Sequence, residues 1–152
     1  MRILVCTDGS EQSQKALEAA SLIAEGPNFN EVAIVHVDEG QPHHSFFPLG
    51  EGTITTDKEM EEFREWQKNY NEKRQKILSD ALEIFEKKNI TARTILKEGR
   101  AAEGILEAAS EEGSAMIIIG SRGLSGLKKA FIGSVSNAVL QEAKNCSVVV
   151  VK

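Results

Sequence analysis

Short apolar runs alternate with longer amphipathic segments along most of the chain. Most of the runs are continuously apolar, as in strands covered on both faces, and all are expected strands: Arg2–Thr7, Glu31–Val37, Thr91–Lys97, Ala115–Ile119 and Ser147–Val151. The segments between them carry apolar residues at helical spacing and are expected helices: Ser13–Glu25, Asp57–Lys88, Ala102–Glu112 and Ser134–Lys144. This alternation predicts an α/β fold: a doubly wound, five-stranded parallel sheet with helices on both faces.

The length and charge narrow the class of protein. A chain of 152 residues is long enough for one domain with its own core, so we expect a single domain over residues 1–152. The net charge of -5 argues against nucleic-acid binding through a basic face, but backbone N–H groups alone can still hold a phosphate. The sequence has no apolar run long enough to span a membrane and no signal-peptide pattern, which predicts a cytoplasmic protein.

The connection between the second and third strands differs from the rest. Residues Asp38–Thr56 contain Pro42 and Pro48 and show no periodicity. A loop of this length inside a compact domain is typical of a functional segment, and a tolerated surface insertion remains an equal alternative.

The candidate binding site centres on a glycine-rich segment, GSRGLSGLKKAFIGS, at Gly120–Ser134. It joins the end of a strand to the start of a helix, where free backbone N–H groups and the helix dipole favour a phosphate. Gly120, Gly123 and Gly133 would permit a close backbone approach, and Ser134 is the expected N-cap of the helix. The spacing matches neither the dinucleotide fingerprint nor a Walker loop. A long strand-to-helix turn with no ligand is the alternative.

Other candidate residues lie in this loop or after the first strand. Arg122 is either a phosphate contact or a solvated side chain. The first strand ends in Thr7-Asp8-Gly9-Ser10. If the first and fourth strands are neighbours, Asp8 and Gly120 face one crevice, and Asp8 could meet ribose hydroxyls or a metal. The alternative is that Asp8 or Ser10 caps the first helix.

These residues resemble the universal stress protein family, specifically its ATP-binding members, which carry G-x-x-G, nine residues and then G-[S/T]. Gly120, Gly123, nine residues and Gly133-Ser134 follow that pattern, and the ending NCSVVVVK is also similar. The resemblance covers nearly the whole chain and implies the strand order 3-2-1-4-5. It also implies ligand roles: Asp8 and the backbone of Val37 for the adenosine half, the glycines and Ser134 for ribose and phosphates, with Gly99 near the pocket and Thr7 lining its adenine end.

The resemblance implies a nucleotide-dependent regulatory or stress-response factor. It would bind ATP, or ADP or AMP in the same loop, with Mg²⁺, and would hydrolyse ATP slowly at most, because no arginine finger or dedicated catalytic base is evident. One alternative is a nucleotide-free dimeric scaffold of the same fold. Another is an adenylating enzyme, which would need an SGGxDS-type loop that Thr7–Ser10 does not supply.

The last strand is a candidate dimer interface. Ser147–Val151 is apolar and β-branched, and by resemblance it lies at the sheet edge, where an unpaired strand invites association. We expect a homodimer in which two copies of this strand pair about a two-fold axis. On this interpretation, Val149→Pro would remove an N–H from the pairing.

Overall fold

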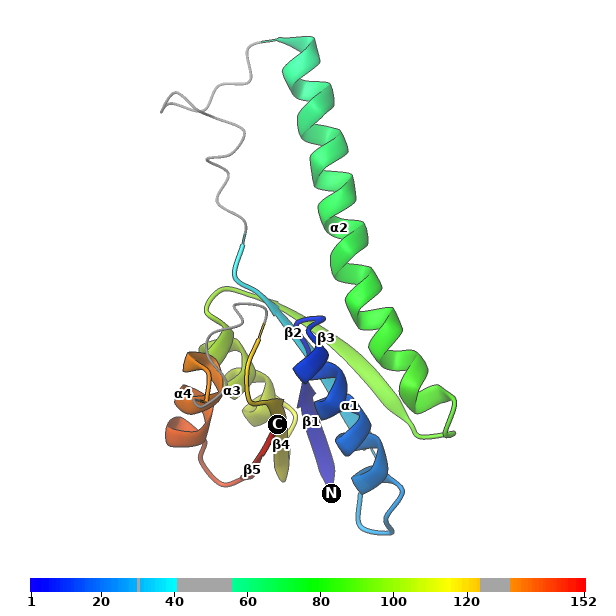
Figure 1. Ribbon diagram of the computed structural model, residues 1–152, viewed down its shortest axis with the longest axis vertical. Helices are drawn as coiled ribbons and strands as arrows, with labels where there is room; N and C mark the ends of the chain where they lie inside the picture. Colours follow the sequence, from blue (N-terminus) through cyan, green and yellow to red (C-terminus); the bar gives the residue numbers. More distant parts are fainter. Residues whose placement is uncertain (30, 41–55, 124–131) are drawn as a thin grey trace.

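The computed structural model describes residues 1–29, 31–40, 56–123 and 132–152, in which strands and helices alternate (Figure 1). The strands are β1 (Arg2–Cys6), β2 (Glu31–Asp38), β3 (Ala92–Glu98), β4 (Met116–Gly120) and β5 (Ser147–Val151). The helices are α1 (Glu11–Ala24), α2 (Asp57–Glu86), α3 (Ala101–Glu111) and α4 (Ser134–Glu142). Every element expected from the sequence is present with small shifts at its ends. Residues 41–55 of the long loop and 124–131 of the glycine-rich segment lie outside the described residues.

The strands form one five-stranded sheet in the order β3-β2-β1-β4-β5, and every neighbouring pair is parallel. This confirms the doubly wound α/β fold and the expected strand order. Because all strands run the same way, their carboxyl ends meet at one edge of the sheet. The order reverses direction at β1, between β2 and β4, and that switch point is where such sheets hold ligands.

Helices cover both faces of the sheet, with α1 and α2 on one side and α3 and α4 on the other (Figure 1). Alternate residues of β1 divide between the two cores, because neighbouring side chains of a strand point to opposite faces. Ile3 and Val5 pack with Leu17 of α1 and Phe85 of α2. The opposite core contains Leu4, Cys6, Val35, Ile105, Ile117 and Val139. Full burial of such side chains stabilises the fold by about 1.5–3 kcal/mol each.

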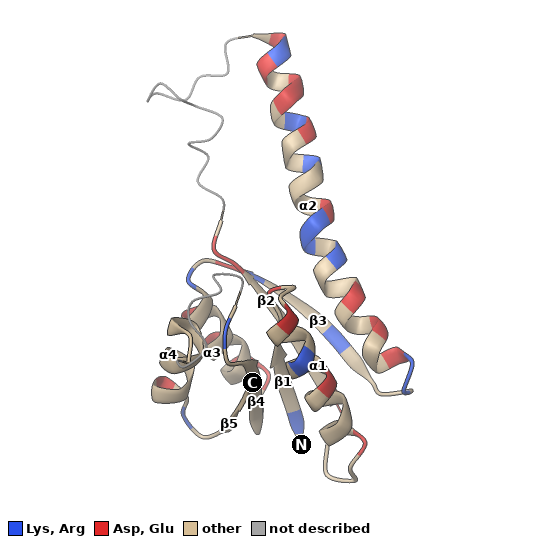
Figure 2. Ribbon diagram, viewed as in Figure 1, with Lys and Arg blue, Asp and Glu red and all other residues tan. Residues whose placement is uncertain are grey.

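Helix α2 is anchored at its carboxyl end and extends beyond the sheet at its amino end (Figure 1). Ala81 and Phe85 are buried, whereas most residues of the first turns are exposed. Thr56 and Glu59 form a capping box that satisfies the first N–H groups. Acidic residues predominate in the first and last turns of α2, and basic residues in its middle (Figure 2). No helix among the described residues has the length and apolar character needed to cross a membrane.

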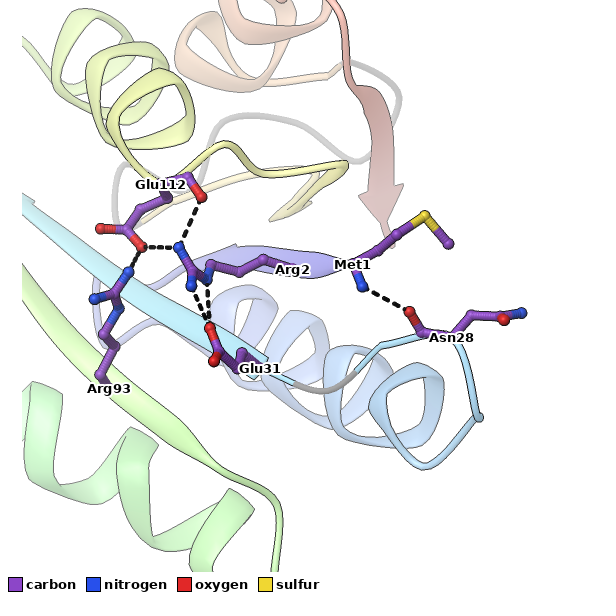
Figure 3. Close-up of polar contacts among 6 residues, drawn as sticks. All are labelled: Met1, Arg2, Asn28, Glu31, Arg93 and Glu112. Carbon is purple, nitrogen blue, oxygen red and sulfur yellow. Dashed lines mark hydrogen bonds and ion pairs between the residues drawn. The ribbon is translucent and has the colours of Figure 1, made fainter.

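A charge cluster ties together the amino ends of the first three strands (Figure 3). Arg2 donates from Nε to Glu31 at 2.9 Å and from Nη1 to the Glu112 carboxylate at 3.0 Å. Arg93 of β3 forms a second ion pair with Glu112, which is the C-cap of α3. Hydrogen bonding to Arg2 is the main cause that lowers the pKa of the Glu31 carboxyl. This cluster lies at the sheet edge opposite the carboxyl ends of the strands.

Strand β5 is an edge strand, and its hydrogen bonds to β4 define which residues face outward. Ser147 donates its N–H to Ala115, and Val151 accepts from the N–H of Ser121. Because alternate residues of a strand direct their main-chain groups to the same side, Val149 also faces β4. The expectation that Val149→Pro removes an outward N–H is therefore wrong. The outward N–H groups belong to Val148 and Val150.

Gly120, at the end of β4, allows α1 to approach the sheet closely. A Cβ on Gly120 would lie 2.8 Å from both the carbonyl carbon and oxygen of Gln12, in the first turn of α1. Backbone atoms cannot move aside as a flexible side-chain tip can. Gly120 therefore has a packing role that does not depend on a ligand.

We expect Gly120→Ala to lower the free energy of unfolding by about 1–3 kcal/mol without any nucleotide, because the added methyl overpacks α1 against β4. Urea unfolding of the apo protein measures this. Gly113→Ala is the matched control: its Cβ would meet no atom within 4 Å, and only its φ of 58° opposes the side chain. If Gly120→Ala were as stable as wild type, α1 would have to shift without penalty.

Candidate functional site

A cavity of about 600 Å³ opens at the carboxyl ends of β1, β2 and β4. Its volume falls within the range of about 300–1,000 Å³ typical of small-molecule sites. The residues predicted from the sequence that line it are Thr7, Asp8, Val37, Gly120, Arg122, Gly123, Gly133 and Ser134. Gly99 is the predicted residue that does not. It lines a separate hollow of about 290 Å³ beside Trp66 and Tyr70.

Thr7 and the turn after β1 form a rigid floor. Thr7 is buried, and its carbonyl oxygen accepts a hydrogen bond of 2.9 Å from Nδ1 of His36. Its hydroxyl lies 3.3 Å from the Ser13 hydroxyl and accepts from the N–H of Gly9 at 3.3 Å. Gly9 has a φ of 79°, which a side chain would oppose, so glycine suits this turn.

The two proposed caps of the first helix take different roles. Ser10 is the N-cap of α1, and its side chain accepts from the N–H of Ser13. Asp8 accepts from the N–H of Ser10 at 2.9 Å, which orients its carboxylate at the cavity wall. Gly123 lies against this carboxylate, because a Cβ on Gly123 would be 2.5 Å from Oδ2 of Asp8. The structure thus brings Asp8 together with the first part of the glycine-rich segment.

Val37 presents main-chain groups to the cavity because β1 ends before β2 does. Thr7 donates its N–H to Val35 at 2.9 Å, the final β1–β2 hydrogen bond within the described residues. Val37 has the same parity as Val35, so its N–H and C=O point to the side that β1 has left. Its side chain instead faces α3, where a Cβ on Gly104 would be 2.9 Å from it. The exposed backbone edge is therefore the chemically distinctive feature of Val37.

The amino end of α4 offers free N–H groups to the same cavity. The N-cap is Gly133 and not Ser134, which is the first helical residue, so the expected capping role of Ser134 is wrong. Gly133 satisfies this position because its backbone is extended and its own N–H donates to Ser121 at 2.7 Å. No described side chain hydrogen-bonds to the cap, and the N–H groups of Ser134, Val135 and Ser136, which line the cavity, have no acceptor within the helix.

The amino end of α3 also reaches this cavity, but a carboxylate already occupies it. Glu39 accepts a hydrogen bond of 3.1 Å from the N–H of Ala101, the first residue of α3. Gly99 precedes this helix with a φ of 117°, and its N–H donates to the main-chain carbonyl of Asp38 at 2.9 Å. The role of Gly99 is thus at the turn from β3 to α3, and a ligand anion would find α4 rather than α3 available.

The sequence interpretation missed a wall of the cavity that α2 supplies. Tyr70, Lys73, Arg74 and Ile77 line it, although they lie far from the other residues in sequence. Ile77 covers the turn after β1, since a Cβ on Gly9 would be 3.2 Å from it. No local motif marks these residues, because they reach the cavity through the docking of a long helix. In the sequence, the acidic residues Asp38 and Glu39 directly follow the expected second strand. This position is a weak indication that they lie at the ligand-binding end of the sheet.

Asp38 joins β2 to α2 at the rim of the cavity. It accepts hydrogen bonds from the Tyr70 hydroxyl, from Nη1 of Arg74 at 2.7 Å and from the N–H of Gly40 at 3.0 Å. Arg74 also donates to Glu98, at the end of β3, at 3.0 Å. Burial alone would raise the pKa of Asp38, but the hydrogen bonds from Tyr70, Gly40 and Arg74 outweigh it and lower the pKa. We call Asp38, Tyr70, Arg74 and Glu98 the α2 latch.

Cys6 and Arg122 also line the cavity. Burial raises the pKa of the Cys6 thiol, and the charge of Asp8 adds to this effect, so Cys6 is an inert core thiol and not a nucleophile. Neither Cys6 nor Cys146 forms a disulfide. Arg122 lines the cavity and forms no ion pair with a described residue. Within the described ranges, no three His, Cys, Asp or Glu side chains gather as a metal site.

The lowered pKa of Asp38 predicts an acid-sensitive α2 latch. A carboxylate with a depressed folded-state pKa stabilises the fold above its unfolded pKa, and this contribution is lost as pH falls through the folded value. We therefore expect the free energy of unfolding of wild type to fall as pH drops below the ordinary value of 3.8. Urea unfolding from pH 6 downward, at roughly half-unit steps, measures this slope.

Asp38→Asn is the matched comparison because it keeps the shape and removes the titrating group. The variant should be less stable than wild type at pH 6, and the difference should shrink toward pH 3. A constant difference across this range would contradict a titrating Asp38.

Comparison with known proteins identifies one family over the full length of the chain. Residues 1–152 match the model of the universal stress protein family. Universal stress protein YxiE of Bacillus subtilis is 36% identical over 158 residues, spanning 99% of this chain and 98% of that protein. Universal stress protein MJ0577 of Methanocaldococcus jannaschii is 31% identical, spanning 99% of this chain and 94% of that protein.

Solved structures agree. The structure of MJ0577 superposes with a TM-score of 0.75 and 28% identity, over 99% of this chain and 94% of that one. A universal stress protein from Archaeoglobus fulgidus in complex with dAMP superposes with a TM-score of 0.64 and 24% identity, over 100% of this chain and 98% of that one. The resemblance found in the sequence is confirmed, and this chain belongs to the universal stress protein family.

Proposed function

We propose that this protein binds an adenine nucleotide, ATP above all, in the cavity at the carboxyl ends of β1, β2 and β4. One observation carries the proposal: the open backbone edge of Val37 and the amino end of α4, which no described side chain caps, face the same cavity of about 600 Å³. The first can recognise a base and the second a phosphate. ADP and AMP could use the same contacts in part.

The Val37 edge suits adenine. An N–H and a C=O on the same side of a strand form a donor and an acceptor in one plane. Adenine offers the complementary pair, an N6 amino donor beside the N1 acceptor, whereas guanine places the O6 acceptor where adenine has its donor. On this proposal Thr7 closes the adenine end, and the same edge disfavours GTP.

The amino end of α4 suits the phosphates. The N–H groups of Ser134, Val135 and Ser136, together with the helix dipole, favour an anion. Gly123 and Gly133 keep side chains out of this approach, and Arg122 adds a positive charge at the wall. Gly120 then supports the site through packing, and Gly99 acts only through the turn before α3.

Mg²⁺ would bind with the nucleotide and not on its own. Mg²⁺ commonly uses one or two carboxylates together with phosphate oxygens. The donor set here fits that arrangement, because Asp8 is the carboxylate that borders both the β1 turn and Gly123. The metal would neutralise phosphate charge, and Asp8 would orient it or meet the ribose hydroxyls.

The proposed role is regulatory rather than catalytic, in a cytoplasmic stress response. Asp38 and Glu39, the other acidic groups at the cavity, are committed to the α2 latch and to the amino end of α3. Asp8, the remaining acidic group, is assigned to Mg²⁺ or the ribose hydroxyls rather than to a catalytic base, and we propose that ATP hydrolysis is slow at most. Universal stress proteins solved with dAMP and with cAMP support adenine-nucleotide binding by this fold in those proteins.

We expect Gly123→Val to weaken Mg-ATP binding by roughly tenfold or more, because its side chain would displace the Asp8 carboxylate and fill the phosphate end. Isothermal titration calorimetry of purified protein measures the dissociation constant. Nucleotide extraction from denatured wild type, followed by chromatography, identifies any ligand carried through purification.

Gly26→Val is the control, since Gly26 follows α1 at the opposite end of the sheet. It should bind Mg-ATP like wild type. Wild type that carries no nucleotide and binds none would refute the proposal and favour a nucleotide-free scaffold. Fast turnover with a co-substrate would favour an adenylating enzyme.

We also propose that the protein forms a homodimer through β5. The strand is at the sheet edge, it contains no proline, and Val148 to Val151 are only partly buried in one copy. The main-chain groups of Val148 and Val150 face away from β4, so a second β5 could accept and donate hydrogen bonds there. Each nucleotide site would remain within its own subunit.

We expect Val150→Pro to convert the dimer to a monomer at micromolar concentration, because it removes an outward N–H. Val149→Pro should instead destabilise the fold, because it removes an N–H that faces β4. Light scattering coupled to size exclusion gives the mass, and thermal unfolding gives the stability. A wild-type monomer would refute the dimer, and a dimeric Val150→Pro would move the interface elsewhere.

A further inference from the structure

We infer that Arg74 of α2 is a positioning residue for the base: through the α2 latch it holds the Val37 edge in the orientation that selects adenine. This inference rests on the proposed nucleotide function and adds a determinant that lies outside the glycine-rich segment. It assigns a role to α2, whose contribution to the cavity no sequence motif marks.

Asp38 connects Arg74 to Val37. Val37 is directly bonded to Asp38, and Asp38 is held by Arg74 at 2.7 Å and by the Tyr70 hydroxyl. No described strand lies beside Val37 on its β1 side. The backbone hydrogen bonds of the sheet therefore hold this end of β2 from the β3 side alone. The α2 latch therefore supplies a restraint that the missing β1 neighbour would otherwise give.

Arg74 contacts the ends of two strands and its own helix. Its guanidinium donates to Asp38, to Glu98 at 3.0 Å and to Asn71 at 2.6 Å, and it lies 4.9 Å from the centre of the Tyr70 ring. One planar group thus fixes the ends of β2 and β3 relative to α2. Lysine has the charge but lacks the rigid fork needed to hold several acceptors at once.

The ion pair between Arg74 and Asp38 is largely buried. The side chains of Arg74 and Asp38 are only 18% and 12% exposed, so solvent screens their interaction weakly. Without Arg74, the Asp38 carboxylate would lose its charged partner, and the end of β2 would shift to bring it into water. A displacement of about 1 Å at a recognition group is enough to weaken binding markedly.

Loss of Arg74 should affect the cavity rim more than the stability of the fold. Arg74 belongs to neither apolar core, and Ala81 and Phe85 anchor α2 to the sheet further along the helix. Loss of the α2 latch should therefore leave α2 docked while it loosens the cavity rim. The base contact, and not the fold as a whole, is the feature most sensitive to Arg74.

The experiment measures ATP and GTP dissociation constants by calorimetry for wild type and Arg74→Met. We expect the variant to bind ATP about tenfold more weakly, the change that follows from losing one hydrogen bond. In the orientation that sets adenine N6 and N1 against Val37, guanine would place its O6 against the carbonyl oxygen and its N1–H against the N–H, so the weak binding of GTP should be unchanged. The ATP-to-GTP preference should then narrow by the same factor, which a loss of stability alone would not produce.

Arg93→Met is the matched control. It removes the same kind of side chain from an ion pair with Glu112, at the opposite edge of the sheet (Figure 3). Its ATP-to-GTP preference should equal that of wild type. Arg74→Lys should recover part of the preference, and Tyr70→Phe, which removes one hydroxyl but keeps the stacked ring, should lose a smaller part.

The outcomes distinguish the two proposals. If wild type and Arg93→Met bind no nucleotide, the proposed function fails, and the role of Arg74 fails with it. If they bind ATP while folded Arg74→Met keeps both its ATP affinity and its ATP-to-GTP preference, only the role of Arg74 is overturned. Equal weakening of ATP and GTP also overturns it. If Arg74→Met does not fold, Tyr70→Phe decides by the same ratio.

Discussion

The site depends on one feature of the sheet: β1 ends while its neighbour β2 continues. The last hydrogen bond between them joins Thr7 to Val35, and Val37 then directs its main-chain groups toward a space that no strand fills. A parallel sheet normally satisfies such groups with the next strand, because an unpaired buried N–H or C=O is unfavourable. The cavity exists because the order of strands reverses at β1, and the helices that follow β1 and β4 leave in different directions.

Two acidic side chains at the cavity already have partners within the protein, and this pairing determines which groups a ligand can contact. Asp38 is neutralised by Arg74, and Glu39 occupies the amino end of α3. Among the described residues, no side chain caps the amino end of α4, so it is the helix end at this cavity that a phosphate can approach. The cavity thus presents the main-chain edge of Val37 at one end and the amino end of α4, which begins at Ser134, at the other.

Much of this could be predicted from the sequence, because it depends on local pattern. Continuous apolar runs gave the strands, and the glycine spacing brought Gly120, Gly123 and Gly133 to the strand end. The roles within the segment were harder to predict: Gly120 packs on Gln12, and Gly133 rather than Ser134 begins the helix. These depend on distances between elements. The α2 wall could not be predicted, because the docking of a long helix after an irregular loop leaves no signature near Tyr70 or Arg74.

The shared position of Asp38 makes the cavity and α2 interdependent. Its side chain belongs to the α2 latch, and its main chain continues directly from the Val37 edge. Under the proposed function, a nucleotide that orders this edge would also stabilise the latch. Linkage then requires the converse, that a partner which shifts α2 alters nucleotide affinity by the same factor. The first turns of α2 extend beyond the sheet (Figure 1), so they are accessible to such a partner. On the proposed function, two carboxylates and one guanidinium of the α2 latch would carry this coupling between an occupied site and an exposed element.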